Sequence, residues 1–226
     1  MRHIRKRPVP KELSSNCKIW THRLQSLVDA NKGKSRKDKT PIPDSVKYAY
    51  RQEPAIKAAL VRECSDKCVY CEAKVTHIAP GDTEHIWPIS RDAKKAFVWS
   101  NLVLACPNCN SNKRVHTGLV NPIDDHPEAH LQSYGPMLSH KIGSVKGEDT
   151  ISKLDLNRVK LLEHRQEKLA LIAHQMERVV TANKAHAKLL LSAIKKEFEP
   201  SKEYSLVVEN FVRARLQEYP DLLGML

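Results

Sequence analysis

Two short cysteine motifs, Cys68-Val-Tyr-Cys71 and Cys106-Pro-Asn-Cys109, decide how the middle of this 226-residue chain folds. Two residues between cysteines let both thiolates of a tight turn face one point, and two such turns supply the four sulfur ligands of a closed tetrahedral zinc site. The alternative is disulfides or redox pairs, but disulfides are disfavoured in a reducing cytosol and two redox pairs in one small chain are unusual. The spacing therefore predicts a structural Zn²⁺ bound by Cys68, Cys71, Cys106 and Cys109.

The other two cysteines fall outside this pattern. Cys64 is close enough in sequence to be a substitute ligand, although a buried free thiol suits it better, and Cys17 lies far from both motifs. A structural zinc would also make folding depend on the metal, because a small loop-rich core has little apolar surface to bury.

Polar residues suited to phosphodiester hydrolysis lie between and after the cysteine motifs, in Gly81-Asp-Thr-Glu-His85, Ser100-Asn-Leu102 and Asn110-Ser-Asn-Lys113. This reaction needs a base to activate water and a divalent ion to stabilise charge on the phosphate. His85 suits the base because an imidazole titrates near neutral pH, and Glu84 offers the hard oxygen that Mg²⁺ or Mn²⁺ prefers. Asn110 can add an amide oxygen ligand, and Asn101 can orient the histidine.

Each of these residues has an ordinary structural explanation when it is taken alone. A histidine beside a glutamate is usually a surface pair, and single asparagines are usually turn or cap residues. Their fixed order, interleaved with two zinc-binding motifs, is what favours a catalytic site.

The order C-x-x-C, E-H-x-x-P, N-L and C-x-x-C-N-x-x-K resembles the HNH nucleases of the ββα-metal class over about residues 65–116. The resemblance implies a β-hairpin bearing His85 as general base, followed by a helix that begins near Asn110. It makes Glu84 a ligand of the catalytic metal and Asn101 the central asparagine. The last motif position maps to Asn110, with Asn112 as an alternative.

The resemblance also bears on neighbouring residues. Asp82 corresponds to an acid found in some relatives and is a further candidate metal ligand. Lys113 and Arg114 are candidates for contacts with phosphate. We expect Trp87 and Trp99 to pack the hairpin rather than to stack on bases.

A narrower resemblance extends over most of the chain. It rests on Arg7-Pro-Val-Pro-Lys-Glu-Leu13, Lys47-Tyr-Ala-Tyr50, Ile56-Lys-Ala-Ala-Leu60, Gly81-Asp-Thr-Glu-His85 and Thr150-Ile-Ser-Lys-Leu-Asp-Leu-Asn-Arg158. These stretches resemble the HNH subunit of Septu-type anti-phage systems, including the retron-associated ones. The resemblance implies an ABC-type ATPase subunit as partner. This sequence has no Walker motif, in keeping with ATP being handled by another chain.

The charge balance favours a polyanionic partner. The chain carries 38 Lys and Arg against 26 Asp and Glu, a formal net charge of +12. Such a surplus favours nucleic acid, although a merely basic soluble protein, or one attracted to acidic surfaces, fits the charge as well. Among nucleic acids, DNA is the expected substrate ahead of RNA. The basic run between Lys32 and Lys39 is expected to be a solvated loop.

The apolar pattern predicts a mainly α chain with a small ββα-metal core stapled by the four-cysteine zinc site, and long C-terminal helices. We divide it into a basic segment with short helices (1–64), the nuclease core (65–120), a loop-rich connection with short hairpins (121–150) and a helical region (151–226). Helices are expected over about 17–30, 45–64 and 155–198, the last broken near Thr181-Ala182-Asn183. Ser201 is expected to cap a further helix that ends near Gln217.

The expected location is the cytoplasm, because no apolar run reaches the length of a membrane span and the basic N-terminus lacks the apolar segment of a signal peptide. Two other functions fit part of the pattern: a non-catalytic zinc-stabilised nucleic-acid-binding module, and an assembly subunit that holds an ATPase. Both leave the combination of Glu84, His85, Asn101 and Asn110 unexplained. The C-terminal helices are equally suited to docking an ATPase and to packing around the core.

Overall fold

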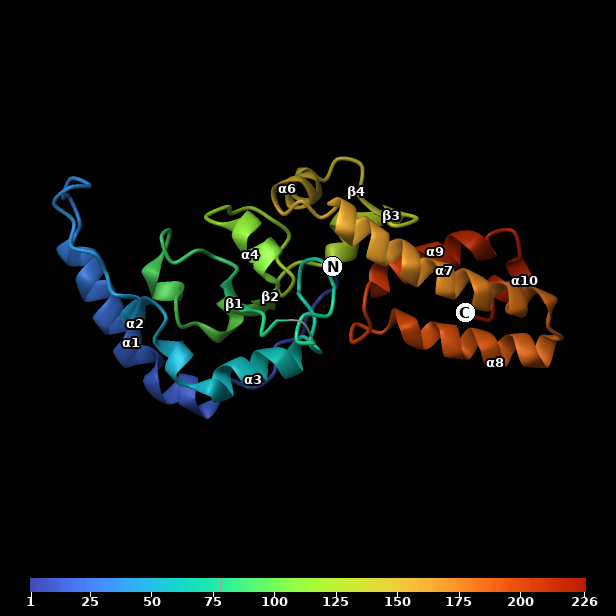
Figure 1. Ribbon diagram of the computed structural model, residues 1–226, viewed down its shortest axis with the longest axis horizontal. Coiled ribbons are helices and arrows are strands. Elements are labelled where there is room, and N and C mark those ends of the chain that lie inside the picture. Colours follow the sequence, from blue (N-terminus) through green and yellow to red (C-terminus); the bar gives the residue numbers. More distant parts are fainter. Residues whose placement is uncertain (78) are drawn as a thin grey trace.

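The chain is mainly helical, with two small antiparallel sheets. The computed structural model describes residues 1–77 and 79–226. Figure 1 shows an elongated molecule, in which the N-terminal helices lie at one end, β1, β2 and α4 lie near the middle, and the long C-terminal helices lie at the other end. The predicted fold class is confirmed. Within the described residues, no helix is both long and apolar enough to cross a bilayer.

Short strands interrupt the succession of helices. In chain order the elements are α1 (Lys11–Ala30), α2 (Asp44–Lys47), the 3-10 helix η1 (Ala49–Gln52), α3 (Pro54–Glu63), β1 (Asp82–His85), η2 (Ala93–Lys95), η3 (Trp99–Asn101), β2 (Leu102–Ala105), α4 (Pro107–Lys113), α5 (Pro127–His130), β3 (Leu131–Tyr134), β4 (Met137–His140), α6 (Val145–Lys153), α7 (Val159–Thr181), α8 (Lys184–Lys195), η4 (Lys196–Phe198), α9 (Ser205–Leu216) and α10 (Pro220–Leu223).

The N-terminal helices differ from the prediction at their boundaries. The first helix begins at Lys11 rather than near Cys17. The helix expected over 45–64 is divided into α2, η1 and α3. Pro54 explains the break between η1 and α3, because a proline disfavours helical backbone at the preceding residue and Glu53 lies at φ −115°. The basic run that follows α1 forms exposed turns, as predicted.

The central core is a β-hairpin followed by a helix. Strands β1 and β2 pair antiparallel, with His85 opposite Leu102 and Asp82 opposite Ala105, and all of β2 is buried. Gly81 leads into β1 at φ +64°, and a Cβ there would lie 2.9 Å from the Leu104 side chain, so glycine is required. Helix α4 begins directly after β2, which gives the expected ββα order.

The connection after the core contains the expected hairpin, β3 and β4, and also two helices that were not predicted, α5 and α6. Ser144 caps α6 by accepting a hydrogen bond from the Gly147 backbone N–H at 3.0 Å. A Cβ at Gly147 would lie 2.4 Å from the His130 carbonyl oxygen, so the helix packs against the chain before β3. The predicted boundary at residue 150 therefore falls inside α6, and the division of the chain into four segments stays a prediction.

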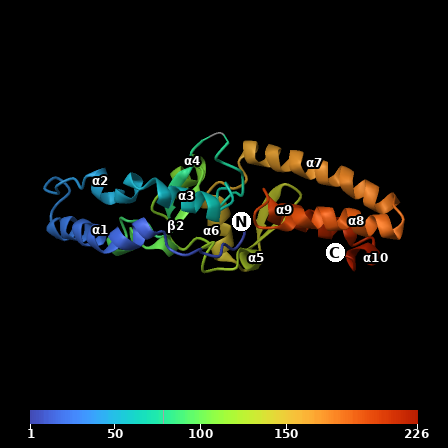
Figure 2. The same ribbon diagram turned by 90° about the horizontal axis from the view of Figure 1, so that it is seen from below.

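Helices α7 and α8 run side by side as a hairpin (Figure 2). The predicted break at 181–183 is confirmed, because Asn183 accepts a hydrogen bond from the His186 backbone N–H at 2.9 Å and caps α8. The capping role predicted for Ser201 is wrong. Helix α9 begins at Ser205, after Tyr204 turns the chain at φ +55°. The residues that α7 buries lie on one stripe: Leu161, Arg165, Leu169, Ile172, Met176 and Val179.

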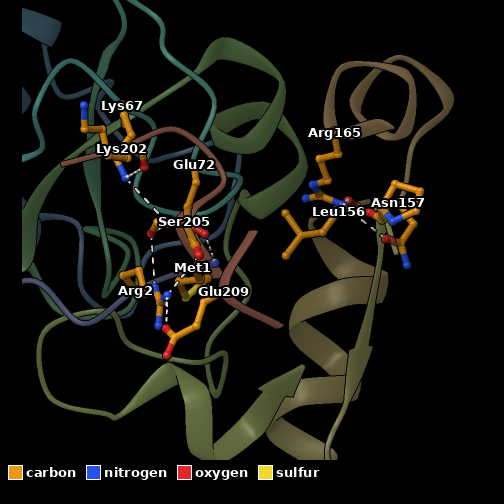
Figure 3. A network of polar contacts seen from close by, with 11 residues as sticks. Met1, Arg2, Lys67, Glu72, Leu156, Asn157, Arg165, Lys202, Ser205 and Glu209 are labelled. Atoms are coloured by element: carbon orange, nitrogen blue, oxygen red, sulfur yellow. Dashed lines mark hydrogen bonds and ion pairs between the residues drawn. The ribbon is translucent and has the colours of Figure 1, made fainter. Parts of the chain in front are cut away.

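A buried polar network joins the N-terminal residues Met1 and Arg2, the chain around the first cysteine motif and α9 (Figure 3). The carboxylate of Glu72 accepts from the Met1 amino group at 2.9 Å and from the Ser205 hydroxyl at 2.9 Å. Arg2 reaches Glu209 at 2.5 Å, and Lys67 donates to the Lys202 carbonyl oxygen at 2.7 Å. The C-terminal helices are therefore anchored next to the cysteine cluster.

Candidate functional site

The four motif cysteines meet at one point. Their Sγ atoms all lie within 4.8 Å of one another, and the Cys71 and Cys106 sulfurs are 3.9 Å apart. A tetrahedral zinc with Zn–S bonds of about 2.3 Å places its sulfur ligands about 3.8 Å apart, whereas a disulfide needs about 2.05 Å. The spacing of the sulfurs therefore fits a tetrahedral metal ion, and all four cysteines are free thiols.

The backbone explains how two distant motifs come together. The Val69 N–H donates to the Leu104 carbonyl oxygen at 3.0 Å, which ties the first motif to β2. The second motif opens α4, where the Cys106 sulfur accepts from the Cys109 backbone N–H. Cys64 is buried outside the cluster, as predicted, and burial raises its pKa to about 11, so it remains a thiol.

Arg158, at the start of α7, faces two of the cluster sulfurs. Its guanidinium nitrogens lie 3.9 Å from the sulfurs of Cys109 and Cys106. Burial lowers the pKa of Arg158, but the neighbouring sulfurs of Cys109, Cys71 and Cys106 raise it by more, so the side chain stays cationic. Four thiolates around a divalent ion would carry a net negative charge, and Arg158 would offset part of that charge.

His85 is held as a neutral imidazole with one nitrogen available. Its Nε2 lies 2.9 Å from the Ala96 carbonyl oxygen, and because a carbonyl only accepts, Nε2 carries the proton. Nδ1 is then the basic nitrogen. The side chain is only 7% exposed, and burial, followed by the positive charges of Lys113 and Arg51, lowers its pKa to about 4. At neutral pH the ring is therefore unprotonated at Nδ1, as a general base must be.

Lys113 does not face solvent, where phosphate contacts were expected. It is only 2% exposed, and its ammonium group lies 2.8 Å from the Glu84 carboxylate and 2.7 Å from the His85 carbonyl oxygen. Burial raises the pKa of Glu84, and the Lys113 charge opposes that rise. Lys113 thus holds β1 and α4 together from the inside, and its contact with phosphate stays a prediction.

Of the two candidate asparagines, Asn110 is the one that lines the His85 cleft. Its amide nitrogen donates to Asp82 at 3.0 Å, which leaves the amide oxygen available to a metal. Asn112 instead donates to the Leu154 carbonyl oxygen. Asp82 acts here as the partner that orients Asn110.

Asn101 does not contact the His85 ring among the hydrogen bonds of the described chain. Its side chain accepts from the Trp87 N–H at 2.7 Å and donates to the carbonyl oxygens of Trp87 and Lys95 at 3.0 and 2.9 Å. These bonds close the loop that carries Ala96, whose carbonyl oxygen holds His85. Asn101 therefore acts on the histidine through the loop.

The two tryptophans have different environments. Trp99 is buried, and its indole N–H donates to the Arg7 carbonyl oxygen at 2.8 Å, so the predicted packing role is confirmed. Trp87 remains 38% exposed, with the Lys95 ammonium 4.5 Å from its ring centre, so it packs only in part.

Glu84, His85 and Asn110 line a single cleft of about 540 Å³. Within the part of the chain that the structure describes, the cysteine cluster is the one place where three or more His, Cys, Asp or Glu ligand atoms converge. A divalent ion in the cleft would therefore be held by Glu84 and Asn110, with water or phosphate oxygens completing its shell, which is typical of Mg²⁺. The donor set, hard oxygens beside a neutral imidazole, fits such an ion.

The rim of this cleft is basic, because Lys47, Arg51, Arg91 and Arg114 all line it. Directly after α4, Arg114 adopts φ +44°, a backbone conformation that residues other than glycine rarely take. Arg51 and Arg91 were not predicted as cleft residues, although the two tyrosines flanked by basic residues in Lys47-Tyr-Ala-Tyr-Arg51 were a usable signal for Arg51. An anionic ligand fits this rim.

Comparisons with known proteins agree with this geometry. Residues 68–115 match the family model described as HNH endonuclease. The chain is 31% identical over 112 residues to a Septu protein PtuB of Bacillus thuringiensis, covering 47% of this chain and 43% of that protein. It is 28% identical over 165 residues to a Septu protein PtuB of Bacillus mycoides (strain KBAB4), covering 56% of each. The matches span about half the length of these relatives. Both predicted resemblances, to HNH endonucleases and to the Septu systems, are confirmed.

Proposed function

We propose that this chain is a metal-dependent endonuclease that hydrolyses nucleic-acid phosphodiester bonds, with His85 as the general base. The observation that carries the proposal is the His85 imidazole, tied at Nε2 to the Ala96 carbonyl oxygen, in a basic cleft with Glu84 and Asn110. It lies inside the segment that matches HNH endonucleases.

In the proposed reaction, Nδ1 of His85 takes a proton from a water molecule. The water oxygen forms a bond to phosphorus, and one P–O bond of the backbone breaks as its electron pair moves to the leaving oxygen, which then takes a proton from solvent. A Mg²⁺ or Mn²⁺ ion held by Glu84 and Asn110 would supply positive charge beside the phosphate and the leaving oxygen. Asn101 and Lys113 keep the base and the carboxylate in position.

We also assign a structural Zn²⁺ to the four-cysteine cluster. The spacing of the sulfurs supports this assignment. Four protein sulfurs complete a tetrahedral shell and leave no position for water or substrate, which is typical of structural rather than catalytic zinc. The two metals would thus have separate tasks, one in the fold and one in the reaction.

A role in a cytoplasmic anti-phage defence complex with an ABC-type ATPase is proposed from the similarity to the Septu proteins. Helices α7 and α8 offer a surface for such a partner, because Leu171 and Leu189 stay largely exposed after the helices pack together. We propose DNA, rather than RNA, as the substrate.

Cleavage by the purified protein tests this function. Plasmid DNA and RNA are incubated with Mg²⁺ or Mn²⁺ near pH 7.5, where His85 is neutral, with and without a co-expressed ABC-type ATPase. We expect cleavage with a divalent ion and none after EDTA. Tight binding of nucleic acid without cleavage under every condition would favour the non-catalytic binding module instead.

Replacing Arg158 by leucine is expected to weaken zinc binding by about 10-fold, because changes next to metal ligands typically cost 10–100-fold in affinity. The lost contacts are those to the sulfurs of Cys106 and Cys109. Zinc release into a chromogenic chelator measures the effect. Arg178→Leu, an exposed site on the same helix, is the matched control, and equal release from both variants would contradict the role of Arg158.

A further inference from the structure

Trp87 follows His85 by two residues and keeps 38% of its surface exposed. It lines a second cleft, of about 440 Å³, which lies between the chain that joins β1 to β2 and the loop after α4. The sequence favoured packing over base stacking for this residue. A large aromatic side chain exposed in a cleft is more typical of a binding surface, so stacking has to be considered again.

A lysine without a carboxylate partner accompanies the exposed ring. The Lys95 ammonium lies 4.5 Å from the Trp87 ring centre, and Lys95 lines the same cleft. Among the described residues Lys95 forms no ion pair, whereas the other two lysines of this cleft each pair with a carboxylate at 2.8 Å. Asp124 also lines the cleft, and its carboxylate accepts from the Asn121 amide at 2.7 Å. Lys95 is therefore available to an anionic ligand.

The backbone beneath these two side chains is fixed by Asn101. Its side-chain amide accepts from the Trp87 N–H at 2.7 Å and donates to the carbonyl oxygens of Trp87 and Lys95 at 3.0 and 2.9 Å. Asn101 is buried, so these three hydrogen bonds are shielded from water. One amide thus holds the two residues together, and an aromatic side chain on a fixed backbone loses little entropy when a ligand stacks on it.

The Trp87 cleft shares a wall with the His85 cleft. Ile86 lines the Trp87 cleft, and so does Lys113, whose ammonium lies 2.7 Å from the His85 carbonyl oxygen. Two residues of extended chain span at most about 7 Å, so Trp87 branches from the backbone within that distance of His85. A nucleotide that adjoins a phosphate bound at His85 is therefore close to the indole ring.

We propose that Trp87 and Lys95 form a stacking platform for an unpaired base of the substrate strand, next to the phosphate on which His85 acts. The base would stack on the indole, and Lys95 would move from the ring to the phosphate of that nucleotide. A cation over an aromatic ring is a weak contact at an exposed site, so a phosphate can draw it away. Aromatic side chains beside cations hold single strands in this way, because every base has a flat face.

This inference rests on the proposed nuclease function and deepens it. It names the substrate class as single-stranded or locally unpaired nucleic acid, since the bases of an intact duplex already stack on one another. The same chemistry, a base and a phosphate, also occurs in a free nucleotide. The test therefore compares strands, duplexes and a mononucleotide.

Binding to matched single strands and duplexes tests the platform. Fluorescently labelled strands of DNA and RNA, and their duplexes, are titrated with full-length His85→Ala protein without added Mg²⁺ or Mn²⁺, and anisotropy reports binding. In that background Trp87→Leu should weaken single-strand binding about 10-fold, the scale of one lost stacking contact, and duplex binding by less than about two-fold. Trp87→Phe retains a ring and should keep most of the affinity. Lys95→Ala should lower the salt dependence by about one phosphate contact.

Tryptophan fluorescence gives a second measurement that a mere packing role would not change. An unlabelled single strand should quench the emission of the parent and leave that of Trp87→Phe almost unchanged, because Trp20 and Trp99 do not line this cleft. A mononucleotide at the same concentration should quench far less, since it lacks the phosphate that binds at His85.

Two control variants isolate the platform. Lys94→Ala removes the same charge from the neighbouring residue, which lines a different groove beside α1. Tyr134→Ala removes an exposed ring from β3, outside both clefts. Both variants should bind single strands as the parent does.

The outcomes distinguish the platform from the proposed function. Parent-like single-strand binding by Trp87→Leu overturns the platform, whatever the wild type cleaves. Equal losses of affinity and of melting temperature in Trp87→Leu and Trp87→Phe also overturn it, because they indicate packing. Equal quenching by the mononucleotide overturns the assignment to a strand. The expected binding losses, together with a wild type that never cleaves, keep the platform and remove the nuclease assignment. A parent protein that binds no nucleic acid overturns both.

Discussion

Replacing His85 by alanine should reduce metal-dependent cleavage by about 10²–10⁴-fold, the usual contribution of a general base. The reason is geometric, since Nδ1 of His85 is the basic nitrogen that the Ala96 carbonyl leaves available in the cleft. The measurement is the rate of plasmid or RNA cleavage under the conditions at which the wild type is active. Zinc content per chain should stay at the wild-type value, because His85 lies outside the cysteine cluster.

Two controls separate loss of the base from loss of the fold. His174→Ala removes an exposed histidine on α7 and should cleave at the wild-type rate. Added imidazole should restore part of the activity of His85→Ala, because the truncated side chain leaves room for a ring beside Tyr50 and Ala96. Wild-type cleavage by His85→Ala would remove the base assignment. Loss of zinc and of cooperative melting in this variant would indicate a structural role for His85 instead.

Local sequence patterns predicted the parts of the fold that depend on neighbours in the chain. The C-x-x-C spacing located all four members of the cluster, and apolar residues at helical spacing located α7 and α8 and the break between them. Helix α6 was missed because Gly147 lowers helix propensity, yet this glycine is required for close packing against His130. Packing contacts of this kind leave no local signal.

The sequence predicted which residues belong to the candidate site, but not which of them contact one another. The sequence places Glu84 beside His85, but it does not reveal that Lys113 turns inward to pair with Glu84. It likewise gave no sign that Asp82 orients Asn110. These relations join segments that only the tertiary fold brings together, and a charged residue is ordinarily expected at the surface.

Replacing Cys109 by serine should remove zinc and unfold the core together. Cys109 is fully buried, and a serine there cannot supply the fourth thiolate of a closed site. Metal binding in such sites contributes directly to folding, with apparent values of about 10–16 kcal/mol in zinc-finger peptides, against a total stability of about 5–15 kcal/mol for a typical domain. The loss of one ligand therefore removes a large share of the stability of the core.

Because of where the cysteine cluster lies in the fold, unfolding around it should also disrupt the His85 cleft. The second motif opens α4, which carries Asn110 and Lys113, and the first motif is tied to β2 through Val69. Cys109→Ser is therefore expected to lose cleavage and nucleic-acid binding together, whereas His85→Ala loses cleavage alone. Zinc per chain by mass spectrometry, thermal melting and anisotropy measure the three consequences.

Cys64→Ser is the matched control, because it makes the same thiol-to-hydroxyl change at a buried cysteine just before the first motif. It lies outside the cluster, so this variant should keep one zinc per chain and lose only the stability that follows from burying a hydroxyl. A soluble, zinc-free Cys109→Ser protein that melts like the wild type would reject the structural metal. Equal zinc loss from Cys64→Ser would instead mean that Cys64 belongs to the ligand set.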